Sequence, residues 1–133
     1  MKTNQQNQQN KVVYDADGKS LGRAASDVAK LLIGKDNVEY SPNKIEKSII
    51  EIKNIERLIY TGKKLTQKKY YTHSGYLGNI KESTLEESLA KGTEKVFIKT
   101  VSGMLAKNRL RKPQIKRIKF SKEKETEASN ERI

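Results

Sequence analysis

The chain has 133 residues, which fits one domain of ordinary size. It carries 28 Lys+Arg against 16 Asp+Glu, a formal charge of +12, and only 34% hydrophobic residues, so we expect a small core and an anionic partner. It has no cysteine and one histidine, which excludes disulfides and argues against a zinc site, and no apolar run approaches the ~18–20 residues of a membrane span.

Three regions differ in composition. Residues 1–10 are rich in Gln and Asn and lack the apolar segment of a signal peptide, so we expect a disordered arm. Residues 11–120 contain the patterned elements and are predicted to form a single domain. Residues 121–133 are charged and poor in apolar side chains, and we expect them to be a disordered tail.

The patterned region opens with a strand, a tight turn and a helix. Val12-Val13-Tyr14 is β-prone and ends at the turn signal 15–18, and an apolar stripe of helical spacing then runs from a candidate N-cap at Ser20 to a C-cap at Gly34. Lys19 and Arg23 lie at the helix N-terminus, where the dipole is already positive. Either both cations are solvated, or they bind a phosphate together with the free N–H groups.

The middle of the chain alternates short strands with polar links. Residues 38–42 are expected to be an extended linker, and 48–52 is the clearest strand, followed by a one-turn link at 55–57. A second β-run at 58–60 leads into the basic stretch 61–78. Strands that alternate with helices and turns predict an α/β sheet, in which loops at the strand C-termini gather at one edge.

Two helices and an edge strand are predicted in the last third. A helix over 83–90, with a capping box of Ser83 and Glu86, is followed by one that begins at Thr93. The apolar stripe of the second helix is expected to face the core; it comprises Val96, Phe97, Thr100, Val101, Met104 and Leu105. A basic loop, stopped by Pro113, then precedes an alternating segment at 115–120.

The excess positive charge is confined to two windows. Arg57 to Lys81 holds six basic residues and no acid, and Lys95 to Lys122 holds ten basic residues and no acid. The other 12 basic residues face all 16 acids, a net of −4. Charge concentrated in this way indicates a nucleic-acid surface more than a generally basic one. Within the stretch 61–78, tyrosines and His73 add faces for nucleobases, although a solvated loop, or a packed histidine, has the same composition.

Catalytic patterns are missing. Thr61-Gly62-Lys63-Lys64 departs from a Walker loop, because Arg57 stands where the first glycine is required and Lys64 where Ser or Thr is required. His73 has no acid or nucleophile that the sequence places beside it. We therefore expect no enzyme, no cofactor, no metal and no small-molecule substrate.

Five segments in one collinear register resemble a known family. They are Val13–Ser26, Glu39–Pro42, Tyr60–Lys63, Lys69–Lys81 and Gly103–Leu105. They are similar to the universal large-subunit ribosomal protein thirteen family in its bacterial or organellar form, and the likeness spans about residues 12–120.

The resemblance implies an α/β fold with three layers, α/β/α, around a small, mainly parallel four-stranded sheet. It implies a structural constituent of the large ribosomal subunit that binds large-subunit ribosomal RNA, lies beside other large-subunit proteins and supports early assembly. It places the protein on cytoplasmic ribosomes, with an organellar ribosome as an alternative, and not in a membrane. The runner-up is a free-standing RNA-binding regulator of translation.

The resemblance and the two charge windows together predict which residues contact RNA. The resemblance implies contacts by Lys19, Arg23, Lys63, Lys69, Tyr71, His73, Ser74 and Gly75, and by the basic segment after Met104. The full candidate set adds Lys64, Lys68, Lys81, Lys107, Arg109, Arg111, Lys112, Lys116 and Arg117.

The chain departs from the family pattern in four places. Residues 43–48 replace a loop that usually holds histidine and an Asp-x-Gly-Asp turn, so we expect no family-type RNA contact there. Asn79 stands for a glycine and Ala106 for a proline, and the end after Phe120 is shorter and more acidic.

Overall fold

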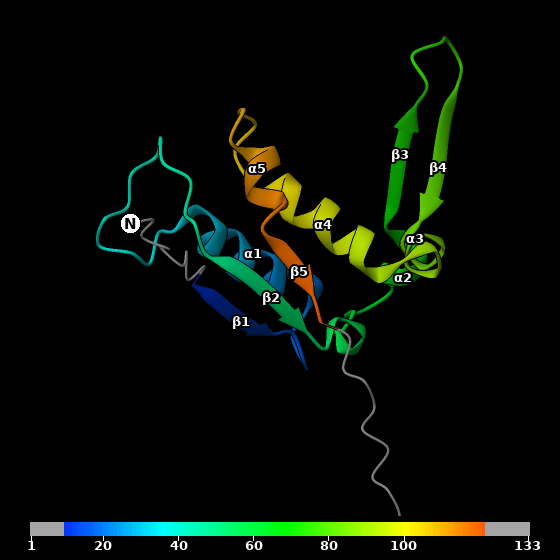
Figure 1. Ribbon diagram of the computed structural model, residues 1–133. Coiled ribbons are helices and arrows are strands. Elements are labelled where there is room, and N and C mark those ends of the chain that lie inside the picture. Colours follow the sequence, from blue (N-terminus) through cyan, green and yellow to red (C-terminus); the bar gives the residue numbers. More distant parts are fainter. Residues whose placement is uncertain (1–9, 122–133) are drawn as a thin grey trace, which may run out of the picture.

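The computed structural model describes residues 10–121, so the arm and tail expected at 1–10 and 121–133 lie almost wholly outside the described residues. The elements follow the order strand, helix, strand, then a short-helix and hairpin segment, then helices and a last strand (Figure 1). They are β1 Lys11–Asp15, α1 Leu21–Ile33, β2 Ile49–Lys53, η1 Ile55–Arg57, α2 Lys64–Gln67, β3 Lys69–His73, β4 Ile80–Thr84, α3 Leu85–Lys91, α4 Thr93–Met104, α5 Arg111–Ile115 and β5 Ile118–Phe120.

The main sheet has three parallel strands in the order β1-β2-β5, with β2 in the centre. A separate antiparallel pair, β3-β4, forms a second sheet. The expectation of one four-stranded sheet is therefore wrong. The β-prone run 58–60 makes one isolated bridge, from Ile59 to Ser20, and does not join the main sheet.

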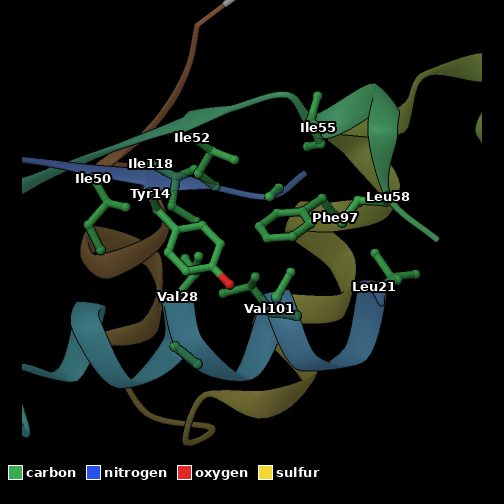
Figure 2. Packing of buried hydrophobic residues seen from close by; sticks show 14 of the residues in the cluster. Tyr14, Leu21, Val28, Ile50, Ile52, Ile55, Leu58, Phe97, Val101 and Ile118 are labelled. Carbon is green, nitrogen blue, oxygen red and sulfur yellow. The ribbon is translucent and has the colours of Figure 1, made fainter. Parts of the chain in front are cut away.

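Helices α1 and α4 lie against each other and cover one face of the main sheet (Figure 1). On this face Ile50 and Ile52 of β2 are fully buried, and Phe97 and Val101 of α4 pack into the same cluster (Figure 2). The opposite face carries charged side chains and the exposed Val13. Within the described residues there are thus two layers, not the expected three.

The first helix agrees with its sequence pattern. Five members of the predicted stripe are buried, namely Leu21, Ala24, Ala25, Val28 and Leu32. The sixth, Leu31, is half-buried, and Ala29, which was not in the predicted stripe, is buried. Gly34 ends it with a φ of 79°, a left-handed conformation that a glycine adopts at little cost. Ser20 occupies the N-cap position, but its side chain makes no capping hydrogen bond.

Details of the later helices differ from the prediction. The capping box joins Thr84 and Glu87 instead of Ser83 and Glu86, because β4 continues through Thr84 before the chain turns into α3. Met104 is 42% exposed although its spacing predicted a core position, whereas Leu105, predicted in the same stripe, is buried. Turns and bends occupy residues 34–39 and 42–44, so the extended linker expected at 38–42 is also wrong.

The C-terminal end of the described chain adds the third strand. Pro113 lies within the first turn of α5 instead of stopping the chain there, which is compatible with the missing N–H of proline. The segment predicted as an edge strand is confirmed at Ile118–Phe120, where it pairs with β2. Phe120 meets Phe97 edge to face at 6.2 Å between ring centroids, which joins the strand to α4.

Candidate RNA-binding surface

The β3-β4 hairpin projects from the α/β body and exposes most of its length (Figure 1). Its turn contains Gly75 and Gly78, with φ values of 90° and 78°. These left-handed positions suit glycine and cost another residue about 1–2 kcal/mol each. Between them Tyr76 and Leu77 stand almost completely in solvent. Two apolar side chains at the tip of a projecting element are available for contact with a partner.

The strand register divides the hairpin side chains between two faces. Lys69, Tyr71 and His73 share one face, since successive residues of a strand alternate. Tyr70 points to the other face, where Lys68 and Lys99 lie over its ring, with Nζ 5.5 and 4.5 Å from the centroid. The contact with Lys99 joins the hairpin root to α4, whereas Lys68 lies directly before β3.

The side chain of His73, the last residue of β3, has a defined orientation. Its Nδ1 accepts a hydrogen bond from the backbone N–H of Gly75 at 2.9 Å. With Nδ1 as the acceptor, the proton of the neutral ring lies on Nε2, which can donate outward to a phosphate or a 2′-hydroxyl. The same bond holds Ser74 and Gly75 in a compact turn beside the ring.

Among the candidate residues of the hairpin, Lys69 forms an ion pair within the protein. Its Nζ lies 3.1 Å from Glu82, across the strand pair. The hydrogen bond to that carboxylate raises the pKa of Lys69. Both side chains are about half exposed, so the pair is screened by water and is easily exchanged for a phosphate contact.

The turn before α1 brings Lys19 close to the start of the basic stretch. Ile59 donates its backbone N–H to the Lys19 carbonyl at 2.9 Å, so Thr61 and the residues after it follow this turn in space. The Lys19 Nζ lies 3.0 Å from the Tyr14 hydroxyl and 3.7 Å from Asp27. These contacts hold the amine over the Tyr14 ring, whereas Arg23 is exposed on the first turn of α1.

The candidate residues of the second charge window lie beyond the C-terminal end of α4, whereas the hairpin lies near its N-terminal end. Five of these candidates line the loop after α4 and the short α5; they are Lys107, Arg109, Arg111, Lys112 and Lys116, and all except the half-buried Arg111 are exposed. Figure 1 shows this loop and the hairpin rising on the same side of the view, with α4 running between them. Two segments that are separate in the sequence thus frame one basic side of the molecule.

Arg117 differs from the other candidates because its guanidinium is turned into the protein. Nη1 donates to the carbonyl of Ser48 at 3.0 Å, and Nη2 donates to the carbonyl of Leu32 in the last turn of α1. Burial lowers the pKa of this guanidinium. The side chain ties the end of α1 to the start of β2, which is a role in folding.

Arg117 and its neighbour Lys116 therefore make a matched test. Arg117→Ala leaves two carbonyls without their donor and is expected to lower the free energy of unfolding by about 1–3 kcal/mol, measured by urea denaturation. Lys116→Ala, at an exposed position, is expected to change it by less than about 0.5 kcal/mol. Equal stabilities of the two variants would contradict the folding role of Arg117.

Sequence reasoning missed the hairpin and the side chains at its tip. Residues 70–73 are β-prone, and Gly75 and Gly78 mark a turn, which together predict a hairpin. The stretch 61–78 was nevertheless expected to be a loop, because neither strand shows an apolar face in the sequence. Tyr76, Leu77 and Ile80 were consequently absent from the candidate set, although all three are exposed.

Other chemistry is not assembled in residues 10–121. A cavity of about 640 Å³ opens near Ile55 and Thr93, and its charged lining includes Glu56 and Glu94 as well as Arg57. Within these residues no group of three His, Cys, Asp or Glu side chains is placed to hold a metal ion. None of the helices described is both long and apolar enough to cross a membrane.

Comparison with known proteins identifies relatives over most of the chain. The family model described as ribosomal protein L13 matches residues 9–127. Proteins named large ribosomal subunit protein uL13 from Nitratidesulfovibrio vulgaris and Alkalilimnicola ehrlichii are each 45% identical over 107 residues, which is 80% of this chain and 74% and 75% of theirs. The protein of the same name from Wolinella succinogenes is 42% identical over 108 residues, 81% of this chain and 78% of its own.

Proposed function

Since the chain belongs to the ribosomal protein L13 family, we propose that it is a structural constituent of the large ribosomal subunit and has no catalytic activity. In this role it binds large-subunit ribosomal RNA, lies beside other large-subunit proteins and supports early assembly. Its relatives are of the bacterial type, which favours a bacterial ribosome as its location over an organellar one.

The observation that supports RNA binding most directly is the projecting hairpin. It presents exposed tyrosines and His73 next to lysines, on an element that contributes little to the core. Lysines neutralise phosphates without reading sequence, and aromatic faces stack on unpaired bases. An exposed pair of short strands of this kind gains stability when folded RNA covers it.

The loop after α4 supplies the second part of the proposed contact. Lys107 and Arg109 are exposed on it, and the short α5 adds Lys112 and Lys116. We assign phosphate contacts to these residues and to Lys63, Lys64, Lys68, Lys69 and Lys81. We assign to Lys19 and Arg23 contacts with RNA near the start of α1. We propose no RNA contact for the loop 43–48.

Sedimentation tests the proposed function. In sucrose gradients of cell extract at high salt, the tagged chain is expected to co-sediment with large subunits, because many simultaneous contacts to folded RNA resist salt better than a single site does. A chain that remains at the top of the gradient, while another large-subunit protein sediments normally, would instead identify a free-standing RNA-binding regulator.

The glycines of the hairpin turn give a local prediction. Gly78→Ala forces a side chain into a φ of 78° and is expected to displace the tip at a cost of about 1–2 kcal/mol. RNA affinity, measured by filter binding, should fall, whereas the domain should remain folded, with a thermal midpoint lower by no more than about 10 °C.

Asn79→Ala is the matched control for this turn. Asn79 is the next residue, and Asn54 is the only non-glycine residue with a positive φ among the described residues, so alanine at position 79 introduces no strain of this kind. If the two variants bound RNA equally well, the shape of the turn would not matter to the contact.

A further inference from the structure

The face of the main sheet opposite the helices is open. The parallel register places Val13 of β1, Ile49 and Glu51 of β2 and Lys119 of β5 on this face, because their neighbours in each strand point into the core. Val13 is 52% exposed. Figure 1 shows α1 and α4 on the other side of the sheet, and within residues 10–121 no helix covers this one.

An open face is unusual for a parallel sheet. Such sheets occur almost only with both faces covered, since their strands carry apolar side chains on both sides. Here Val13 and Ile49 are the apolar side chains, and Lys11, Asp15, Glu51, Lys53 and Lys119 lie around them. Two neighbouring apolar side chains within a charged surround are compatible with a small interface that has a polar rim.

The outer edge of β1 adds free backbone groups beside this face. The bonds from Ile49 N–H to the Asn10 carbonyl and from Ala16 N–H to the Lys53 carbonyl direct the even-numbered residues of β1 toward β2. The N–H and C=O groups of Lys11, Val13 and Asp15 therefore point away from the sheet. In the strand order of the described residues, β1 has no neighbour on that side.

The chemistry of this corner favours polypeptide over RNA. A strand edge offers donors and acceptors in alternation, and only another peptide backbone satisfies both; RNA phosphates would leave the carbonyls unpaired. Two carboxylates, Asp15 and Glu51, also lie here and repel phosphate. Lys11 is held 2.7 Å from Glu51, which lowers the pKa of that carboxyl, so one of the three lysines on this face is already paired.

We propose that the outer edge of β1 and the open face around Val13 bind an extended segment of a neighbouring large-subunit protein. The segment pairs through its backbone with β1 and lays an apolar side chain on Val13 and Ile49, and a carboxylate of the partner reaches Lys119. The proposal rests on the proposed function for the presence of such a neighbour. It assigns the sheet side of the molecule to protein and the hairpin side to RNA.

Site-specific photo-cross-linking in purified large subunits tests the assignment. A benzophenone side chain in place of Val13 is expected to cross-link to one identified ribosomal protein by mass spectrometry. The same group in place of Leu77, at the hairpin tip, is expected to cross-link to RNA. A Val13 probe that cross-links to RNA, to a second copy of this chain or to nothing, while the Leu77 probe reports RNA, overturns the inference and leaves the proposed function intact. Absence of both probe proteins from large subunits would contradict the proposed function itself.

A proline substitution then tests the backbone pairing. Val13→Pro removes one outward N–H and leaves the bonds from β1 to β2, as proline on an edge strand can. With the benzophenone in place of Lys11, Val13→Pro is expected to lower the protein cross-link at least fivefold, and Val13→Ala, which keeps the N–H, to lower it less. Equal yields in the two variants would reject strand pairing, and the thermal midpoint of each variant verifies that the sheet is intact.

Discussion

Replacing Val28 with aspartate is expected to unfold the domain. Val28 has no exposed surface and lies in the centre of the α1 stripe, directed at the cluster formed with Tyr14 and Val101 (Figure 2). A buried carboxylate without a partner costs several kcal/mol, which is comparable to the whole stability of a small domain, about 5–15 kcal/mol. Circular dichroism at 25 °C is expected to show loss of the helical signal.

Two further variants are the controls for Val28→Asp. Lys30→Asp places the same carboxylate on the exposed side of α1 and is expected to cost about 1 kcal/mol, because it changes the helix propensity and the interaction with the helix dipole but buries no charge. Val28→Ala introduces no charge and is expected to lower stability by about 1–3 kcal/mol through lost packing. A folded Val28→Asp protein, with a midpoint near that of Lys30→Asp, would show that the α1 stripe is not the core.

The triple variant Arg23→Ala, Lys63→Ala, Lys69→Ala is expected to bind ribosomal RNA far more weakly and remain folded. All three side chains are exposed. If about eight phosphates are neutralised, the logarithm of affinity falls with the logarithm of salt at a slope near −7, and losing three contacts changes the slope by about 2.7. Between about 1 M and 0.1 M salt that difference amounts to roughly 500-fold in affinity.

A charge-matched triple variant distinguishes an effect of the proposed RNA-binding surface from an effect of net charge. Lys11→Ala, Lys53→Ala, Lys119→Ala removes three lysines whose positions in the register lie on the open sheet face. Because this face is assigned to a protein neighbour, the slope is expected to change by less than about one unit. Equal slopes for the two triple variants, measured by filter binding across a salt series, would show that RNA responds to net charge alone.

Elements with a buried stripe were predictable from the sequence, and exposed or long-range ones were not. The strand, turn and helix at the start, the central strand and the helix α4 carry apolar patterns, and the structure confirms them. The hairpin was missed because both of its strands are exposed, so no alternation of burial marks them. The fourth strand was predicted in error because β-propensity at 58–60 does not reveal whether a partner strand is within reach.

The same division applies to the candidate site. The two acid-free windows, and with them the class of partner, follow from a census of charges along the chain. The state of single side chains does not. Arg117 resembles its basic neighbours in the sequence, yet its guanidinium bonds to carbonyls 69 and 85 residues away. Lys19 likewise acquires its place from Tyr14 and Asp27.

By itself, then, the sequence determined the excess of positive charge, the segments that carry it and the likeness to one ribosomal family. Charge and local periodicity depend on residues that are neighbours in the sequence, so they can be read without knowing the fold. Only the tertiary structure decided which cations are free and which are used internally, because that depends on contacts between distant segments. It also decided that the basic hairpin projects away from the core and that one face of a parallel sheet is left uncovered.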